Sequence, residues 1–109
     1  MLNNKQCIPC QGGIPPMSSS EILKFQKFIH VDWKVNNDKE LTKDFNFQSY
    51  SESMRFANRV ADLSEEQGHH PYIHVNFKLV KIILFTHKIA GLHENDFLMA
   101  NKIEELILS

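Results

Sequence analysis

The sequence predicts an α+β fold: a four-stranded antiparallel sheet with three helices packed on one face, in the order α-β-β-α-β-β-α. Three observations lead to this expectation. They are two helix starts with capping-box spacing, strand segments in which apolar and polar residues alternate, and a polar turn between the first two strands. At 109 residues the chain has the length of one domain with a modest core. We place this domain at residues 18–109, after an N-terminal arm at residues 1–17.

The first helix begins at one of the serines at 18–20, because Ser18 and Glu21 have the spacing of a capping box. Trp33 and Val35 indicate a first strand. The polar run at residues 36–39 then predicts a turn, and residues 41–47 return as the second strand of a hairpin. The apolar positions of the first helix share one face: Ile22, Phe25 and Ile29.

The second helix has clear start and stop signals. Ser49 is a good N-cap with Glu52 three residues later, which again is capping-box spacing. Gly68 is suited to end the helix in a left-handed conformation because it has no Cβ. Pro71 then restricts His70 to extended backbone. The expected apolar stripe of this helix consists of Tyr50, Met54, Ala57, Val60, Ala61 and Ser64, with Phe56 and Leu63 beside it.

The second half of the chain predicts two strands, at residues 72–77 and 80–87, and a third helix at 94–108. In the third strand one parity holds Ile73, Val75 and Phe77, and the other holds Tyr72, His74 and Asn76. In the fourth strand one parity holds Ile82, Leu84 and Thr86, and the other holds Lys81, Ile83, Phe85 and His87. The third helix offers Leu98, Ile103, Leu106 and Ile107 for packing.

Composition excludes some classes of function. Twelve Lys and Arg against thirteen Asp and Glu give no basic surplus, so we expect no direct nucleic-acid binding. The start of the chain lacks an apolar signal region, and the longest apolar run, residues 79–85, is short and interrupted by Lys81. We therefore expect no membrane association and a cytoplasmic protein.

The two cysteines, Cys7 and Cys10, form a Cys-x-x-Cys pair in the N-terminal arm. Two thiols cannot complete a tetrahedral zinc site, which needs four protein ligands. A thioredoxin-type site needs a strand before the pair and a helix after it, and the following Gly-Gly-Ile-Pro-Pro provides neither. We favour an irregular arm with reduced thiols. A metal site shared between two chains, with two thiolates from each, is the alternative.

Most of the proton-transfer groups of the chain fall in one region. His69, His70 and His87 are the candidate catalytic residues, because imidazole is the side chain that gains or loses a proton near neutral pH. A simpler interpretation is that the adjacent pair only caps a helix C-terminus, where cations are favoured. Zinc binding is disfavoured because adjacent residues rarely bind one ion together and no H-E-x-x-H spacing is present. We expect no metal.

The ordered set of these residues carries a family resemblance. The pattern Glu65-x3-His69-His70-Pro71-x5-Phe77-x9-His87-x8-Asp96 resembles the signature of the pterin-4a-carbinolamine dehydratases. The arm Cys7-x-x-Cys10-x-Gly12-Gly13-x-Pro15-Pro16 and the segment Thr86-His87 followed by Ala90-Gly91-Leu92 resemble members of this family as well. The resemblance covers nearly the whole chain.

This resemblance implies that the protein dehydrates 4a-hydroxytetrahydropterin to quinonoid dihydropterin. The reaction recycles the pterin cofactor of aromatic amino acid hydroxylases, and the family uses no metal and no bound cofactor. It implies acid and base roles for His69 and His87, with His70 binding or orienting the pterin, although the division among the three stays open. The resemblance further implies a homodimer or homotetramer. Substrate-binding or orienting roles fall to Glu65, Pro71 and Asp96, of which Asp96 orients an imidazole or caps the third helix.

Some positions depart from the family pattern. His93 stands where many members have a Ser or Thr that caps the third helix, and it is a poorer cap. Ile83 and Phe85 stand where smaller polar residues are familiar, and we expect them to line the substrate cleft or a subunit contact.

Non-catalytic binding is the alternative function. Relatives of the same fold act as a dimerisation cofactor of a transcription factor or as an assembly factor for a carbon-fixing enzyme. The presence of all three imidazoles favours catalysis, because a binding module has no need of them.

Overall fold

The computed structural model describes residues 15–108, and side chains up to Ile107. Cys7, Cys10 and most of the predicted N-terminal arm therefore lie outside the described residues. In the described part of the chain, no helix combines the length and the apolar character that a membrane crossing requires.

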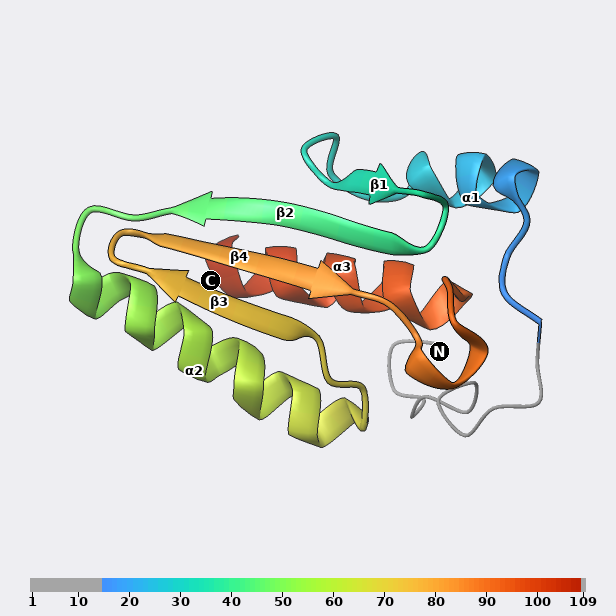
Figure 1. Cartoon of the computed structure of the whole chain (residues 1–109). Coiled ribbons are helices and arrows are strands. Elements are labelled where there is room, and N and C mark those ends of the chain that lie inside the picture. Colours follow the sequence, from blue (N-terminus) through green and yellow to red (C-terminus); the bar gives the residue numbers. More distant parts are fainter. Residues whose placement is uncertain (1–14, 109) are drawn as a thin grey trace.

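The described chain forms three α-helices, four strands and one short 3₁₀ helix (Figure 1). In chain order the elements are α1 (Ser19–Gln26), β1 (Lys34–Asn36), β2 (Glu40–Asn46), α2 (Tyr50–Gln67), β3 (Tyr72–Asn76), β4 (Leu79–Leu84), η3 (His87–Ile89) and α3 (Glu94–Leu108). The predicted α-β-β-α-β-β-α order is confirmed, and η3 is an addition that the sequence did not predict.

All neighbouring strands are antiparallel, and the sheet has the order β1-β2-β4-β3. Figure 1 shows α2 and α3 on the same face of the sheet. Helix α1 packs against α3, with the Phe25 and Phe97 rings 5.5 Å apart. Among residues 15–108 no helix covers the opposite face of the sheet, and we call it the open face. The predicted fold class is confirmed.

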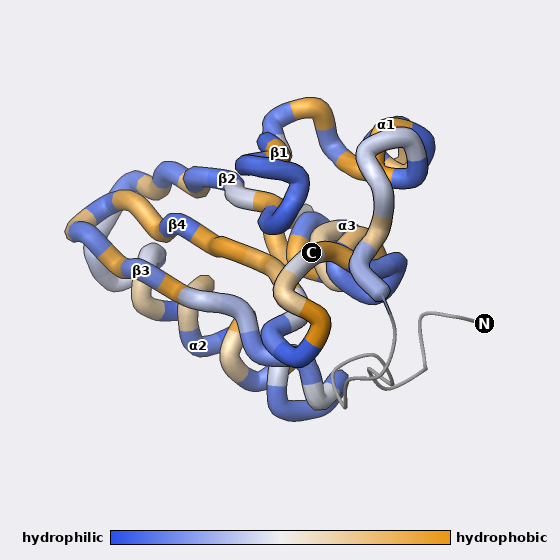
Figure 2. The backbone as a smooth tube through the Cα atoms, turned by 45° about the vertical axis from the view of Figure 1, so that its right-hand side comes forward, coloured by the Kyte–Doolittle hydropathy of each residue, from blue (hydrophilic) through white to orange (hydrophobic). Residues whose placement is uncertain are grey.

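Strand β4 lies in the middle of the sheet and is hydrophobic along most of its length (Figure 2). Its predicted parity is confirmed, since Ile82 and Leu84 are fully buried while Lys81 is exposed. The strand ends at Leu84, three residues before its predicted end, and beyond it Thr86 is buried and His87 exposed. The core between the sheet and the helices is built from buried apolar residues of every layer: Ile22, Trp33, Leu41, Phe45, Phe56, Val60, Val80, Ile82, Leu84, Leu92, Phe97, Met99, Ala100 and Ile103.

The start of α1 agrees with the prediction. The Ser18 hydroxyl accepts a hydrogen bond from the Glu21 backbone N–H, and the Glu21 carboxylate accepts one from the Ser18 backbone N–H, which completes a capping box. The Ser18 backbone N–H is the main reason why the pKa of Glu21 lies below its ordinary value.

The hairpin between β1 and β2 turns at Asn37 and Asp38, whose φ angles are 53° and 56°. Asn and Asp tolerate this left-handed conformation better than other non-glycine residues, which explains why the polar run forms the turn. Trp33 was predicted to lie in the first strand. It lies one residue before β1, and its ring is buried.

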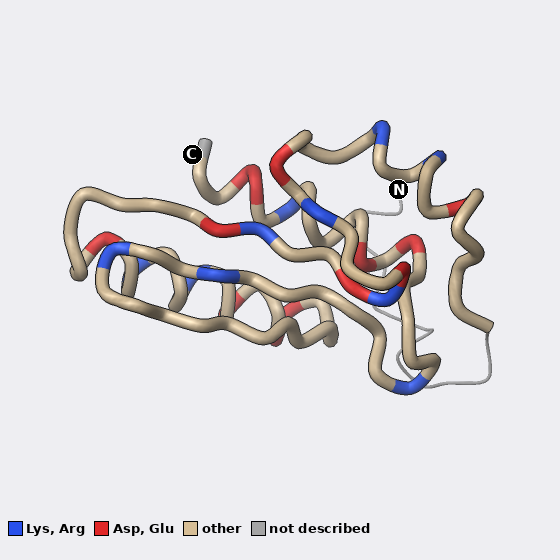
Figure 3. The backbone as a smooth tube through the Cα atoms, turned by 45° about the horizontal axis from the view of Figure 1, so that its top comes forward, with Lys and Arg blue, Asp and Glu red and all other residues tan. Residues whose placement is uncertain are grey.

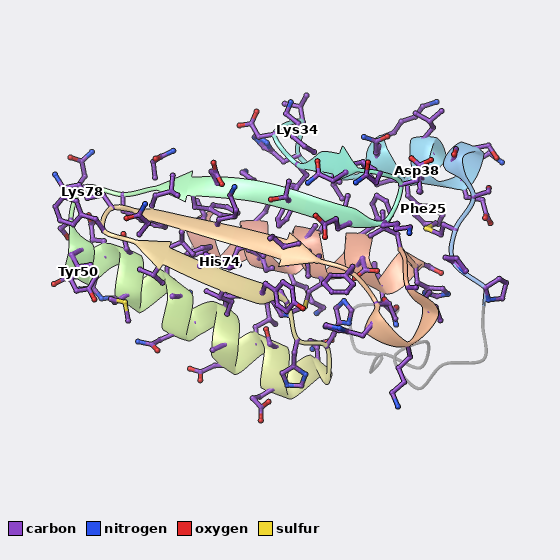
Figure 4. All side chains as sticks on the ribbon, in the orientation of Figure 1. Phe25, Lys34, Asp38, Tyr50, His74 and Lys78 are labelled. Carbon is purple, nitrogen blue, oxygen red and sulfur yellow. The ribbon has the colours of Figure 1, made fainter. Side chains whose placement is uncertain are left out.

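Helix α2 starts at its predicted cap, but the reciprocal bond differs. Ser49 Oγ accepts from the Glu52 backbone N–H at 3.2 Å, while the Glu52 carboxylate accepts from the Gln48 N–H rather than that of Ser49. The predicted stripe was also wrong at its edges, because Tyr50 and Ala61 are exposed. Tyr50 lies at the end of the molecule away from Phe25 (Figure 4).

Two serines of α2 lie on the buried face: Ser53, which the predicted stripe omitted, and Ser64, which it included. Ser53 and Ser64 are buried because their hydroxyls donate to the backbone carbonyls of Ser49 and Val60, one helical turn earlier. A serine satisfied in this way behaves as a small core residue. Hydrophobicity alone could not have indicated it.

We expect the substitution Ser49→Ala to lower the free energy of unfolding by about 1 kcal/mol, because the Glu52 N–H loses its cap acceptor. Urea unfolding followed by circular dichroism measures this change. Ser51→Ala, at an exposed position of the same helix, is the matched control and is expected to change stability by less than about 0.5 kcal/mol. Equal effects of the two substitutions would contradict the capping role.

Phe77 was predicted to lie in the third strand on the parity of Ile73 and Val75, and this was wrong. It lies in the turn between β3 and β4 with a φ of 55°, and its side chain is 62% exposed. The Lys78 ammonium lies 5.2 Å from the centroid of the Phe77 ring, so the exposed ring makes a cation–π contact. Ile73 and Val75, the other two residues of that parity, are partly buried against the core as expected.

Candidate functional site

The end of α2 directs His69 into the molecule. Gly68 adopts a left-handed conformation with a φ of 67°, which only glycine reaches without cost, and thereby ends the helix as predicted. The His69 backbone N–H then donates to the Ser64 carbonyl oxygen at 3.1 Å. The His69 side chain is consequently buried, with 3% of the residue exposed.

His69 is paired with Asp96 across the core. Its Nε2 lies 2.6 Å from Oδ1 of Asp96, which is in the first turn of α3 and fully buried. The other carboxylate oxygen, Oδ2, accepts from the Thr86 hydroxyl at 2.9 Å and from the His93 backbone N–H at 3.0 Å. One carboxylate therefore joins the end of α2, the end of β4 and the start of α3.

His93 takes part in this arrangement as the residue before α3. The Asn95 N–H donates to its Nδ1 at 3.4 Å, so the imidazole occupies the place of a capping hydroxyl. The Asp96 carboxylate accepts a hydrogen bond from the His93 backbone N–H, as the acid of a capping box does. Asp96 thus caps the helix and also binds an imidazole. The sequence had offered these two roles as alternatives.

His87 is the first residue of η3. The loop that carries it is closed by Thr86 and Gly91, whose backbones exchange hydrogen bonds of 2.8 and 3.4 Å. His87 itself is exposed, and its ring lies 4.2 Å from the Phe85 ring and 5.8 Å from the Tyr72 ring, centroid to centroid.

His70 is exposed and turns back toward α2. Its Nε2 lies 2.5 Å from Oε2 of Glu65, which is also exposed. Pro71 follows it, half-buried, and leads into β3. His74 lies on β3 with an exposed side chain (Figure 4). His30 is also exposed and accepts a hydrogen bond from the Asp32 N–H.

The structure thus joins two of the three histidine segments through one carboxylate, because Thr86, which binds Asp96, directly precedes His87. His70 is held separately by Glu65. Sequence reasoning missed the contributions of Thr86, Tyr72 and the His93 ring. The signal for Thr86 was present, since a hydroxyl on the inward parity of a central strand needs a buried partner.

In the described part of the chain, no cluster of three or more His, Cys, Asp or Glu side chains has a geometry that could hold a metal ion. His69 and His70 contact carboxylates, and His87 contacts two aromatic rings. Such contacts orient imidazoles and leave them able to exchange protons.

Comparison with known proteins decides the family. The family model described as pterin 4 alpha carbinolamine dehydratase matches residues 15–106. The chain belongs to this family. A relative from Alkaliphilus metalliredigens with the provisional name pterin-4-alpha-carbinolamine dehydratase is 44% identical over 95% of this chain and 94% of its own length. A relative from Methylococcus capsulatus with the same provisional name is 44% identical over 96% of this chain and 92% of its own.

Solved structures of pterin dehydratase relatives share the fold. A protein from Brucella melitensis, titled transcriptional coactivator/pterin dehydratase, matches with a TM-score of 0.77 at 26% identity, over 84% of this chain and 97% of the other. A pterin dehydratase-like protein titled as a RuBisCO assembly factor of the alpha-carboxysome matches with a TM-score of 0.60 at 30% identity, over 71% and 94%. The titles of this family therefore name both an enzyme activity and roles in binding other proteins.

Proposed function

We propose that this protein dehydrates 4a-hydroxytetrahydropterin to quinonoid dihydropterin by general acid and base catalysis with His69, His70 and His87. The observation that carries the proposal is the buried hydrogen-bonded set of His69, Asp96 and Thr86, next to the exposed His87. A family match alone would not say which groups act. Together with His87, this set supplies two imidazoles, from segments that the Asp96 carboxylate ties together.

The reaction removes the hydroxyl from C4a and the hydrogen from N5 and leaves a double bond between these atoms. An acid must protonate the departing oxygen while a base accepts the N5 proton. Two imidazoles, one protonated and one neutral, satisfy both requirements near neutral pH. The two protons end on the released water and on the base, so the pair needs one proton exchange with solvent to reset.

The carboxylate of Asp96 determines which nitrogen of His69 can take part. An ionised carboxylate only accepts hydrogen bonds, so we assign the hydrogen to His69 Nε2. The contact of Glu65 with His70 Nε2 orients the second imidazole in the same manner, which supports a role for His70 in binding or orienting the pterin.

The decisive experiment follows the decay of enzymatically generated 4a-hydroxytetrahydropterin with the wild-type protein and with His69→Ala, His70→Ala and His87→Ala. We expect the wild type to accelerate the decay and the substitutions at His69 and His87 to lower kcat at least about 100-fold. His30→Ala removes an exposed imidazole outside the site and is expected to leave the rate unchanged. Equal rates for the wild type and all three site variants would refute the assignment.

A binding module of the same fold is the second candidate, because the titles of two solved relatives name a coactivator and an assembly factor. It is distinguished by the same assay. A wild-type protein without dehydratase activity, while still folded by circular dichroism, would favour binding over catalysis.

The expected homodimer or homotetramer and the cytoplasmic location stay predictions. One feature supports self-association: β3 is an edge strand that carries no Lys, Arg, Asp or Glu (Figure 3). Edge strands that stay unpaired usually carry charges that prevent pairing with another chain. Analytical ultracentrifugation of the full chain measures the oligomeric state, and a monomer at micromolar concentration would contradict the expectation.

A further inference from the structure

Three aromatic rings meet at the end of the open sheet face, where β4 runs into η3. The ring centroids of Phe85 and His87 are 4.2 Å apart, those of Tyr72 and Phe85 are 5.3 Å apart, and those of Tyr72 and His87 are 5.8 Å apart. The Tyr72 ring meets the other two edge-on, at 73° and 71°, and the Phe85 and His87 rings are tilted by 46°. We call these three side chains the ring cluster.

The strand register produces the ring cluster. Tyr72 on β3 is paired with Ile83 on β4, and Phe85 lies two residues after Ile83 on the same face. Tyr72 and Phe85 are therefore diagonal neighbours, close enough for aromatic rings to touch. His87 follows after two more residues, at the point where the chain leaves the strand for the 3₁₀ turn.

His87 differs from the other two histidines in what holds its ring. A carboxylate of Asp96 orients His69, and a carboxylate of Glu65 orients His70. Within residues 15–108, the contacts recorded for the His87 ring are those with Tyr72 and Phe85. An exposed imidazole with no other support would sample several rotamers.

We propose that Tyr72 and Phe85 are positioning residues, which fix the orientation of the His87 imidazole toward the pterin. This inference rests on the proposed dehydratase function and adds two residues to it. Edge-to-face and tilted ring contacts stabilise a defined relative orientation of the rings beyond the burial of their area. A fixed general acid or base reacts faster than one that must first rotate into place.

Phe85 could instead serve only as an apolar cover for the sheet, and substitutions of different shape separate the two roles. Leucine retains an apolar side chain of similar burial but has no ring, while tyrosine retains the ring. Orientation of His87 therefore predicts a loss with Phe85→Leu and a rescue with Phe85→Tyr. If Phe85 only covers the sheet, both Phe85→Leu and Phe85→Tyr are expected to keep the rate of the wild type.

The test measures kcat and KM for dehydration with the wild type, Phe85→Leu, Phe85→Tyr and Tyr72→Leu. We expect Phe85→Leu and Tyr72→Leu to lower kcat by about threefold to tenfold with KM within about twofold of wild type. Phe85→Tyr is expected to restore most of the rate. Lys81→Thr changes an exposed residue of the same strand and face, and controls for disturbance of the sheet.

A second measurement needs no substrate. The ring protons of His87 in the wild type are expected to show NMR shifts caused by the neighbouring aromatic rings, and these shifts are expected to shrink in Phe85→Leu. The positioning role would be refuted by an unchanged kcat in Phe85→Leu, by a rise in KM alone, or by an equal loss in Lys81→Thr. Failure of the proposed dehydratase function has a separate signature: the wild type and His87→Ala would then dehydrate the substrate at equal rates.

Discussion

Replacing Asp96 by Asn is expected to lower kcat for dehydration by about 100-fold or more, which is the usual value of one general acid or base. Asparagine has nearly the same shape as aspartate, but one of its oxygens becomes an NH₂ group. If this group faces His69, it donates to Nε2, which must then give up its hydrogen. The imidazole is forced into the other tautomer, and its proton exchange with the pterin fails.

The other orientation of the new amide group in Asp96→Asn also carries a cost, in stability. If the NH₂ group faces Thr86 and the His93 backbone, it meets a backbone N–H that can only donate. A buried donor without an acceptor costs about 1–3 kcal/mol. We therefore expect Asp96→Asn to lower both the activity and the free energy of unfolding.

Activity and stability are separated by measuring both on the same preparation, with kcat determined well below the unfolding midpoint. Thr86→Val removes one donor to Asp96 and keeps the size of the side chain, so it is expected to cost stability with a smaller loss of rate. Asp44→Asn, on the exposed face of β2, is the matched control. A fully active Asp96→Asn protein would show that the tautomer of His69 has no part in the reaction.

The fold could be predicted because its elements are specified locally. Ser18 with Glu21, the Asn37-Asp38 turn and Gly68 each determine one chain reversal or helix end from their own backbone chemistry. The parity of β4 followed from strict alternation, and it located Thr86 inside and His87 outside. Such signals depend on residues a few positions apart, so they are visible in a single sequence.

The contacts that complete the site were less accessible, because they join residues far apart in the chain. Asp96 was expected to orient an imidazole, but nothing in the spacing indicated that it would bind His69 rather than His87. The ring contact of Tyr72 with Phe85 depends on the β3–β4 register. The stripe of α2 omitted Ser53, which is buried because its hydroxyl donates to the Ser49 carbonyl of the same helix.

One buried charge also escaped the sequence analysis. Lys43 lies on the inward parity of β2, between the core residues Leu41 and Phe45. Its ammonium forms an ion pair with Glu104 of α3, and the two side chains are only 9% and 17% exposed. The same Glu104 oxygen accepts a hydrogen bond from the Trp33 indole at 3.1 Å.

Replacing Lys43 by Met is expected to lower the free energy of unfolding by about 3 kcal/mol, because it leaves the Glu104 carboxylate largely buried with one remaining donor. Methionine matches the length of the lysine stem. The contact of the Lys43 ammonium with the Phe45 ring, 4.7 Å from the centroid, is lost as well and adds to the expected cost. The midpoint of urea unfolding is expected to fall while the slope stays the same, since the surface exposed on unfolding is unchanged.

The chain provides its own control for this prediction. Lys81 and Asp44 form a second lysine–carboxylate pair between β4 and β2, on the opposite face of the sheet, 3.9 Å apart and about half exposed. Lys81→Met is expected to change stability by less than about 1 kcal/mol, because solvent screens that pair.

We attribute the larger stability loss expected for Lys43→Met than for Lys81→Met to burial of the remaining carboxylate rather than to loss of the ion pair itself. A double substitution tests this directly. In Lys43→Met with Glu104→Gln, the uncompensated charge is gone while the glutamine oxygen still accepts from Trp33. We expect the double variant to be more stable than Lys43→Met alone. A double variant whose loss equals the sum of the two single losses would show that Lys43 and Glu104 act independently. The packing of α3 against β2 would then not depend on their contact.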